Sequence, residues 1–355
     1  MNTRIKQLQT KLKQLNIDSI LIYDEMNRRY LSGFTGSSGY LYISTSRSVL
    51  LTDFRYMEQA AKQCKEFEVF DHSDLGILKT FQKIISEDHA EKIGFETGIS
   101  YSEYKALNEE LASIQLIETT NIVEDIRMIK DEDELSCIKK AAFIADGAFK
   151  HILPFIKIGV TEIDIALELE YYMKKNGGQK LSFDTIVASG KNSSLCHAEP
   201  SLKKIEKGDF ITMDFGCVYN GYCSDMTRTV VMGSASDTQK KIYNIVLNAQ
   251  KMALNSLMAG LTGQEVDRVA RDIIYEAGYR DNFGHGLGHS LGLEVHENPR
   301  VAPKGHVKLQ QNMMVTIEPG IYIPGYGGVR IEDLVCVKEN GYENFTHSEK
   351  DLIEL

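Results

Sequence analysis

Two similar segments follow one another in the chain after residue 158, and their repetition limits the possible folds strongly. Residues 159–164 and 260–265 both place a threonine where a helix would begin, with an acidic residue three positions later. This spacing predicts a capping box at the start of each helix. Residues 210–216 and 314–320 each combine a strand-like run with a threonine and a carboxylate two positions apart. The repeated order of helix, loop and acidic strand predicts a duplicated fold with a site at its seam. Chance similarity is the alternative, because the matched stretches are short.

The chain before the repeat has a different pattern, in which short apolar runs alternate with amphipathic helical runs. This alternation predicts an α/β domain. The predicted strands are 19–23, 40–44, 49–52, 68–70 and 92–95, and the predicted helices are 5–15, 54–64, 75–86 and 102–111. A charged stretch follows, and we place a domain boundary near residues 122–127. We therefore expect an N-terminal domain at 1–124 and a second domain at 125–355, since a chain of 355 residues is long enough for two domains.

The charge and hydropathy of the chain argue against several kinds of partner. The net charge of −10 is unfavourable for nucleic acid, which selects clustered Lys and Arg, and for an anionic membrane surface. No apolar run approaches the ~20 residues of a membrane span. The N-terminus also lacks the apolar core of a signal peptide. We expect a cytoplasmic protein that binds neither nucleic acid nor membrane.

The cysteines show no spacing that is typical of a metal site or a redox motif. None forms a C-x-x-C pair, and in a chain this long they do not indicate a disulfide framework. We expect buried or half-buried free thiols at Cys64, Cys137, Cys196, Cys217, Cys223 and Cys336.

A hairpin is predicted around the Asn-Gly pair at 220–221, because this dipeptide favours a two-residue turn between strands. In that register Asp214 faces Thr227, and Asp225 lies on the same face, diagonal to Asp214. Diagonal side chains are roughly 7–8 Å apart by Cα. Two carboxylates at that spacing repel unless a cation lies between them. A bulge at Gly216 would shift this register.

A second hairpin brings two more acids together. The Gly/Pro-rich turn at 324–328 separates two apolar runs, and a hairpin centred on Gly325 places Glu318 opposite Glu332. Burying four unpaired carboxylates would be prohibitive, and several divalent charges would resolve this. Solvated strand faces are the alternative, but apolar residues flank the acids at Met213, Phe215, Ile317 and Ile331.

Histidines form the third part of the pattern. His285, His289 and His296 fall within a glycine-rich stretch, and His197 follows a polar loop. The glycines make a helix unfavourable, so His285 and His289 are not a helical zinc pair of the H-E-x-x-H type. Glycines instead let the backbone approach something closely. A lone histidine is usually a satisfied polar residue, but three so close together indicate a functional site.

Together these motifs resemble the Xaa-Pro peptidases of the creatinase/aminopeptidase fold, namely prolidase and aminopeptidase P, with methionine aminopeptidase as a shorter relative. The resemblance covers essentially the whole chain, including Arg-Tyr-Leu-Ser-Gly-Phe at 29–34. It implies an α/β N-terminal domain, an α+β "pita-bread" catalytic domain with a pseudo-twofold repeat, and a homodimer.

The resemblance also implies a role for each residue of the pattern. The implied metal ligands are Asp214, Asp225, His289, Glu318 and Glu332, of which Asp225 and Glu332 would bridge two metals. The implied catalytic residues are His197, His285, His296 and Glu318. The implied substrate-binding residues are His197, His285, Arg300 and Arg330. Arg330, beside Glu332, is also implied to support the metal ligands.

The chemistry implied is hydrolysis of the bond between an N-terminal residue and a following proline in dipeptides or short peptides. Four carboxylates and one imidazole suit hard divalent ions, Mn²⁺ first and otherwise Co²⁺, Zn²⁺ or Fe²⁺. A metal-bridging hydroxide would be the nucleophile. Glu318 would transfer the proton, while His197 and His296 stabilise the oxyanion. Arg300 in a His-Glu-Asn-Pro-Arg string would hold the carboxylate of a dipeptide.

Three other functions remain open from the sequence. Aminopeptidase P would act on longer peptides with the same ligands. A methionine aminopeptidase usually lacks the N-terminal domain. A non-catalytic peptide-binding module would be expected to have lost some ligands, and this chain has kept them.

Overall fold

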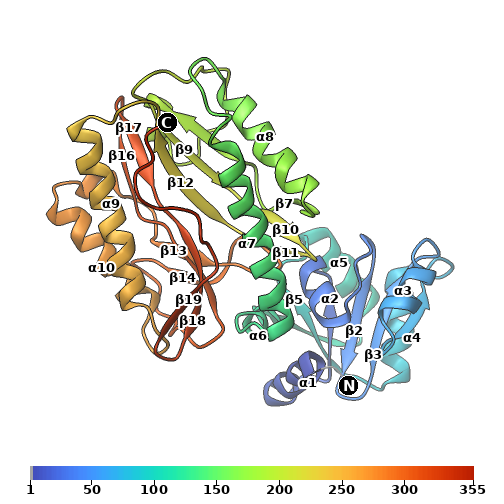
Figure 1. The fold of residues 1–355 in the computed structure, drawn as a ribbon. Helices are drawn as coiled ribbons and strands as arrows, with labels where there is room; N and C mark the ends of the chain where they lie inside the picture. Colours follow the sequence, from blue (N-terminus) through green and yellow to red (C-terminus); the bar gives the residue numbers. More distant parts are fainter. Residues whose placement is uncertain (1–2) are drawn as a thin grey trace. The chain divides into compact units, whose positions relative to one another are not determined.

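A computed structural model of the protein describes residues 3–355 (Figure 1). The chain folds into two compact units, Met1–Arg127 and Met128–Leu355. Residues 1 and 2, part of the predicted N-terminal domain, lie outside the described residues. No helix in the described part of the chain is long and apolar enough to cross a membrane. All six cysteines are free thiols, four of them buried.

The N-terminal unit is a six-stranded sheet with helices, which confirms the predicted α/β class. The strand order is β4-β3-β2-β1-β5-β6, and β1 runs parallel to β5 but antiparallel to β2. The strands are β1 (Ser19–Ile22), β2 (Tyr40–Ser44), β3 (Ser48–Thr52), β4 (Glu68–Asp71), β5 (Lys92–Glu96) and β6 (Gln115–Thr119). The helices are α1 (Thr3–Leu15), α2 (Glu25–Ser32), α3 (Met57–Gln63), α4 (Ile77–Glu87), α5 (Tyr101–Glu110) and α6 (Glu124–Arg127).

The second unit consists of four long helices and several short sheets. Its helices are α7 (Glu132–Ile152), α8 (Glu162–Lys175), α9 (Asp237–Ser256) and α10 (Gly263–Glu276), with short 3-10 turns η1 (Gly190–Ser194) and η2 (Arg280–Asn282). The strands of its first half are β7 (Lys180–Leu181), β8 (Ile186–Ser189), β9 (Phe210–Phe215), β10 (Cys217–Tyr219), β11 (Tyr222–Cys223) and β12 (Met226–Val231). The strands of its second half are β13 (Gly288–Ser290), β14 (Glu297–Val301), β15 (Met314–Ile317), β16 (Gly320–Ile323), β17 (Gly327–Arg330), β18 (Asp333–Lys338) and β19 (Gly341–Asn344).

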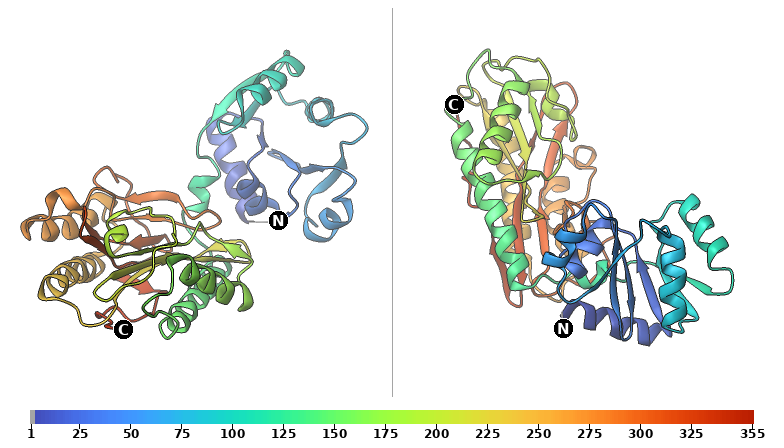
Figure 2. Two further views of the ribbon diagram at one scale, coloured as in Figure 1. Left: turned by 90° about the horizontal axis from the view of Figure 1, so that it is seen from above. Right: turned by 90° about the vertical axis from the view of Figure 1, so that its right-hand side faces the viewer.

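Both predicted capping boxes of the repeat are confirmed at the two helix starts. Thr161 caps α8 and Thr262 caps α10, and each forms a complete capping box with the acid three positions later. Each threonine hydroxyl accepts a hydrogen bond from a backbone N–H that the first turn of the helix leaves unpaired. Each helix then packs against strands of its own half of the unit (Figures 1 and 2).

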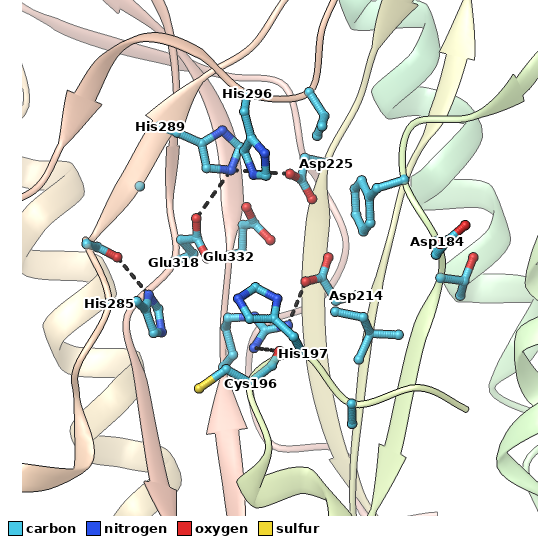
Figure 3. Close-up of a pocket in the computed structure, with 18 of the residues that line it drawn as sticks. Asp184, Cys196, His197, Asp214, Asp225, His285, His289, His296, Glu318 and Glu332 are labelled. Carbon is cyan, nitrogen blue, oxygen red and sulfur yellow. Dashed lines mark hydrogen bonds and ion pairs between the residues drawn. The ribbon is translucent and has the colours of Figure 1, made fainter. Parts of the chain in front are cut away.

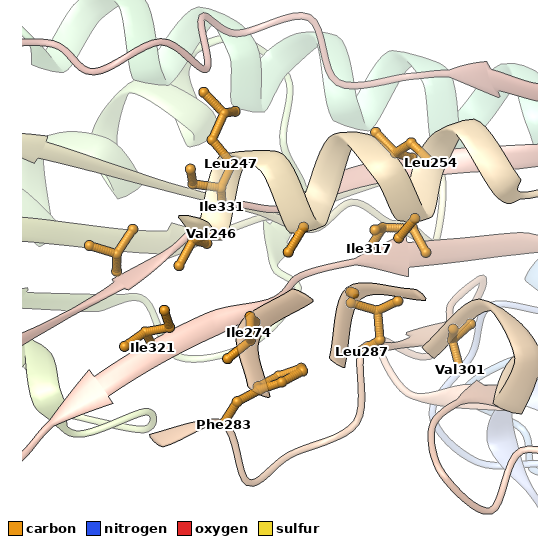
Figure 4. Packing of buried hydrophobic residues seen from close by; sticks show 14 of the residues in the cluster. Val246, Leu247, Leu254, Ile274, Phe283, Leu287, Val301, Ile317, Ile321 and Ile331 are labelled. Carbon is orange, nitrogen blue, oxygen red and sulfur yellow. The ribbon is translucent and has the colours of Figure 1, made fainter. Parts of the chain in front are cut away.

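Apolar packing against the helices fixes which face of each acidic strand points inward. Met213 and Phe215 are fully buried in the cluster under α7 and α8, so Asp214 between them points the other way. Ile317 and Ile331 lie in the corresponding cluster under α9 and α10 (Figure 4). Full burial of such side chains contributes roughly 1.5–3 kcal/mol each. This packing therefore places the neighbouring acids on the opposite face.

Both predicted hairpin registers are correct. Asp214 pairs with Thr227 between β9 and β12, and β10 and β11 continue the same register, so Gly216 introduces no shift. Gly216 opposes Asp225, and a Cβ there would lie 1.9 Å from the Ser224 carbonyl oxygen. On the second hairpin, the pairings on both sides of Glu318 and Glu332 keep these two acids opposite each other.

The two halves of the repeat meet along β12. The backbone N–H of Glu332 donates to the Thr227 carbonyl at 3.1 Å. Thr229 Oγ1 also donates to the Arg330 carbonyl at 2.9 Å. The acids of both halves are thereby brought to one seam, as the duplicated pattern predicts.

Candidate active site

A cavity of about 520 Å³ lies over this seam, and all ten site residues predicted from the sequence line it (Figure 3). They are His197, Asp214, Asp225, His285, His289, His296, Arg300, Glu318, Arg330 and Glu332. They come from both halves of the repeat and are separated by up to 135 positions in the chain. The fold therefore brings together the whole predicted set.

Three of these residues form a tight, buried cluster. Ligand atoms of Asp225, His289 and Glu332 all lie within 4.8 Å of one another. Asp214 on β9 and Glu318, which follows β15, complete the acidic group around them (Figure 3). The five residues are the predicted metal ligands.

The tautomer of His289 leaves a lone pair directed at this cluster. Its Nδ1 lies 3.1 Å from the Ser290 carbonyl oxygen, which can only accept, so Nδ1 carries the proton. Its Nε2 lies 3.5 Å from Asp225 Oδ2 and 3.4 Å from Glu318 Oε1. Burial lowers the pKa of His289 to about 3, so the ring is neutral. An acceptor nitrogen that faces two carboxylates is the arrangement that a cation requires.

The acids repel one another strongly when they are without a cation. Burial, with the charges of Glu332 and Asp214, raises the pKa of Asp225 well above its ordinary value. Burial also raises the pKa of Glu332, with Glu318 and Asp214 adding to the effect. For Glu318, burial raises the pKa to about 8. Buried carboxylates of this kind are stable when they coordinate a metal.

Unsatisfied oxygens provide an independent test of whether a metal fits. Asp214 Oδ1, Asp225 Oδ1 and Glu332 Oε1 are buried and have no hydrogen-bond partner among the described residues. Buried polar atoms without partners are rare in native proteins. Four carboxylates and one neutral imidazole are a suitable donor set for a divalent ion. The site therefore fits a divalent metal.

The other oxygens of these acids are held by two threonines, whose supporting role the sequence did not reveal, and by Arg330. Thr227 Oγ1 donates to Glu332 Oε2 at 2.7 Å, and Thr316 Oγ1 donates to Glu318 Oε1 at 3.2 Å. Arg330 donates to Asp214 Oδ2 at 2.6 Å. The signal for Thr316 was present in its spacing, since a residue two positions before an acid in a strand shares the face of that acid.

The three other histidines of the predicted site, His197, His285 and His296, lie in different surroundings. His285 Nδ1 lies 2.7 Å from the Gly286 carbonyl and Nε2 lies 2.9 Å from the Tyr322 hydroxyl, while burial lowers the pKa of the ring to about 4. The ring of His296 packs edge-on against His289 with centroids 4.5 Å apart. His197 is exposed at the cavity. His197 and His296 are therefore more accessible than His285.

The two arginines of the predicted site, Arg300 and Arg330, differ in burial and in hydrogen bonding. Arg330 is buried, and besides Asp214 it donates to Thr227 Oγ1, Tyr322 Oη and the Cys196 carbonyl. Arg300 pairs with His289 across β13 and β14 but is exposed. Its guanidinium makes no hydrogen bond or ion pair with another described residue. It is thus available to a ligand in the cavity.

Comparison with known families agrees with this geometry. The profile of "Metallopeptidase family M24" matches residues 136–339, and that of "Creatinase/Prolidase N-terminal domain" matches residues 4–129. The chain therefore belongs to metallopeptidase family M24, and the family resemblance predicted from the sequence is confirmed.

Individual relatives match over the full length. The structure of an Xaa-Pro dipeptidase from Bacillus anthracis is 48% identical, with 99% of each chain covered and a TM-score of 0.97. The Xaa-Pro dipeptidase of Pyrococcus furiosus is 39% identical over 99% of this chain and 100% of that protein. An X-Pro aminopeptidase structure from Thermotoga maritima is 39% identical, with 97% and 100% covered and a TM-score of 0.92. These matches confirm the predicted creatinase/aminopeptidase-like fold.

Proposed function

We propose that this chain is a metal-dependent Xaa-Pro peptidase whose preferred substrates are dipeptides. The observation that carries the proposal is the buried cluster of Asp225, His289 and Glu332, with unsatisfied carboxylate oxygens, on the wall of a single cavity. Relatives named Xaa-Pro dipeptidase, at 39% and 48% identity over nearly the whole chain, support this choice of reaction.

The proposed metal centre holds two divalent ions, Mn²⁺ in the first place and Co²⁺, Zn²⁺ or Fe²⁺ as alternatives. Asp225 and Glu332 would be shared between the two ions. Asp214 would complete one site, and His289 with Glu318 the other. Bound divalent ions supply an activated water and polarise the carbonyl of the scissile bond.

Proton transfer is assigned to Glu318. Its carboxyl lines the cavity and is half-buried, with 16% of the side chain exposed. A carboxylate within hydrogen-bond reach of the attacking water can accept its proton and later return it. Glu318 would take the proton released by the attacking water and deliver it to the leaving proline nitrogen.

Stabilisation of the negative charge that develops on the carbonyl oxygen is assigned to two histidines. His197 and His296 both line the cavity and are exposed to it. Each can donate a ring N–H to an oxygen that becomes negative as the carbonyl is attacked. His285 and Arg330 would act on the substrate from positions that their protein partners fix.

Restriction to dipeptides is assigned to Arg300. A dipeptide ends in a free carboxylate one residue after the cleaved bond. Arg300 is exposed at the cavity and its guanidinium has no hydrogen-bond or ion-pair partner among residues 3–355, so the planar group can bind both carboxylate oxygens. A longer peptide would present an amide there, which binds a cation less strongly.

A second candidate is aminopeptidase P activity on longer peptides. It is favoured by the match to the Thermotoga maritima X-Pro aminopeptidase, which is as similar in sequence as the Pyrococcus furiosus dipeptidase. An exposed Arg300 would be compatible with this activity.

One assay separates these functions. Rates are measured on Leu-Pro, Leu-Pro-Leu and Met-Ala, with the purified protein stripped of metal and then supplied with Mn²⁺. We expect Mn²⁺-dependent hydrolysis that is fastest on Leu-Pro. A faster rate on Leu-Pro-Leu would support aminopeptidase P, and cleavage of Met-Ala would support methionine aminopeptidase. Binding of these peptides without hydrolysis would indicate a non-catalytic module.

The assembly and location are a further part of the proposal. We expect a cytoplasmic homodimer that binds neither nucleic acid nor membrane, consistent with the net charge of −10. Sedimentation velocity measures the assembly, and fractionation of the source cells measures the location.

A further inference from the structure

The loop that carries His197 is held at both of its ends by one buried carboxylate. We call residues 190–200 the His197 loop. It begins directly after Ser189, the last residue of β8, and ends before Ser201. Between these ends it presents Cys196 and His197 to the cavity (Figure 3).

Glu162, the first residue of α8, contacts both ends of this loop. Glu162 Oε1 accepts hydrogen bonds from the Ser189 backbone N–H at 2.7 Å and from Ser189 Oγ at 2.8 Å. Glu162 Oε2 accepts from the Ser201 backbone N–H at 3.1 Å and from Ser201 Oγ. Asn192 Nδ2 lies between the two oxygens, at 3.1 and 3.2 Å.

The buried side chain of Glu162 is stabilised by these hydrogen bonds. Glu162 is fully buried. Every hydrogen bond that its carboxylate accepts from the described residues comes from the His197 loop or from its two end residues. A buried carboxylate is unfavourable unless it is hydrogen-bonded, and the N-terminal end of a helix adds only modest stabilisation. The carboxylate is therefore stable only while the two ends of the loop stay together.

The middle of the loop is hydrogen-bonded to Arg330 and to the backbone of Gly328. The Cys196 carbonyl accepts from Arg330 at 3.2 Å, and Arg330 also binds Asp214. Ser193 Oγ accepts from the Gly328 backbone N–H at 2.8 Å. With Glu162 at the base and Arg330 in the middle, the backbone on both sides of His197 is constrained.

We propose that Glu162 is a positioning residue that holds His197 at the substrate. The inference rests on the proposed function for the role of His197 in the reaction. Glu162 lies outside the cavity lining and acts through the shape of the loop. Its carboxylate links Ser189 and Ser201 across the base of the loop, and the Ile163 backbone N–H adds a hydrogen bond to the Ser201 carbonyl at 3.2 Å.

The principal test is Glu162→Gln, which keeps the size of the side chain but replaces one acceptor oxygen with an NH₂ group. That group would face N–H and O–H donors, and the loop base should open. We expect kcat/KM for a Xaa-Pro dipeptide to fall about ten- to a hundredfold, with metal content unchanged. Glu168→Gln on the same helix is the matched control, since Glu168 contacts His151 on the surface, and its kcat/KM should stay within about twofold of wild type.

A double-variant measurement separates positioning from general structural damage. His197→Ala should reduce kcat/KM strongly in the wild-type background and have little further effect in the Glu162→Gln background, because both act on one interaction. If the two losses multiply fully, Glu162 does not act through His197 and the proposal is overturned.

A second readout needs no activity. Cys196 neighbours His197, so opening of the loop should speed its alkylation by iodoacetamide about tenfold or more, as measured by peptide mass spectrometry, while Cys137 on α7 reacts at an unchanged rate. An unchanged Cys196 rate in Glu162→Gln would overturn the proposal.

If the wild type hydrolyses no Xaa-Pro peptide, the proposed function fails, and the Cys196 rate still decides whether Glu162 holds the loop. If Glu162→Gln does not fold, Ser201→Ala removes a single donor and should change both readouts in the same direction, and no change would again overturn the proposal.

Discussion

Replacing Asp333 by alanine should destabilise the second unit by about 3–5 kcal/mol, because it leaves a buried arginine without its charge partner. Asp333 is fully buried and Arg228 is 1% exposed, and their side chains meet at 2.8 Å. Asp333 also accepts hydrogen bonds from Gln250 at 2.9 Å, from Asn344 at 3.1 Å and from Lys350. The other hydrogen bonds that Arg228 donates to described residues go to backbone carbonyls, including that of Glu332, so the pair also fixes the backbone at a proposed metal ligand.

The magnitude can be measured by thermal unfolding with circular dichroism on metal-free protein. A loss of 3–5 kcal/mol should lower Tm by about 6–20 °C for a unit of this size. Asp351→Ala is the control, since the Asp351 side chain is 79% exposed and pairs with Lys251 at 3.6 Å, and it should change stability by less than about 0.5 kcal/mol. Arg228→Met in the Asp333→Ala background should recover part of the loss by removing the unpaired charge. A stability of Asp333→Ala within about 1 kcal/mol of wild type would refute this reasoning.

Three further predictions concern the cavity and the N-terminal unit. His296→Ala should reduce kcat by about 10²–10³ with metal still bound, since one oxyanion donor is lost, and loss of metal instead would make His296 a ligand. Arg300→Ala should raise KM for Leu-Pro about ten- to a hundredfold and leave KM for Leu-Pro-Leu nearly unchanged, whereas equal effects would mean that Arg300 does not bind the C-terminus. Burial raises the pKa of Glu96 to about 6, so the folded state binds more protons than the unfolded state between pH 4.5 and 6. The unfolding free energy should therefore rise by up to about 2 kcal/mol from pH 7 to pH 4.5 relative to Glu96→Gln, and a constant difference between the two proteins would contradict the assignment.

The acids could be placed from the sequence because strand alternation is strict and one turn signal was strong. The Asn-Gly pair at 220–221 fixed the pairing of Asp214 with Thr227, and buried apolar neighbours fixed the face. The effect of Gly216 could not be decided in advance. A glycine is compatible both with a bulge and with close backbone approach, and the structure has the close approach to Ser224.

Two elements that lack an apolar period, α2 and β6, were not predicted from the sequence. Helix α2 buries Asn27 and Arg28, and these polar residues bind Glu96 and the carbonyls of Gly36 and Gly39. Strand β6 is a half-exposed edge strand that carries polar residues. Sequence periodicity reports apolar burial, so a helix whose inner face is hydrogen-bonded gives no such signal.

Long-range support of the site could not be predicted either. Glu162 meets Ser189 and Ser201 only because β8 and the loop return to the start of α8. Arg330 reaches Asp214 from 116 positions away. Such contacts depend on the closed fold, and which cavity residues hold metal or substrate stays a prediction until it is measured.

The most direct test of the central claim is the metal content and the Leu-Pro hydrolysis rate of wild type and Asp225→Asn, measured on the same preparations. Metal is counted by inductively coupled plasma mass spectrometry after dialysis against Mn²⁺, and circular dichroism checks the fold. Asp225 lies in the buried cluster with His289 and Glu332, and its substitution removes a charge that both ions would share. We predict two ions per chain and rapid hydrolysis for wild type, and one ion or none with no hydrolysis for a folded Asp225→Asn. An Asp225→Asn protein with two bound ions and a near-normal rate would contradict the account.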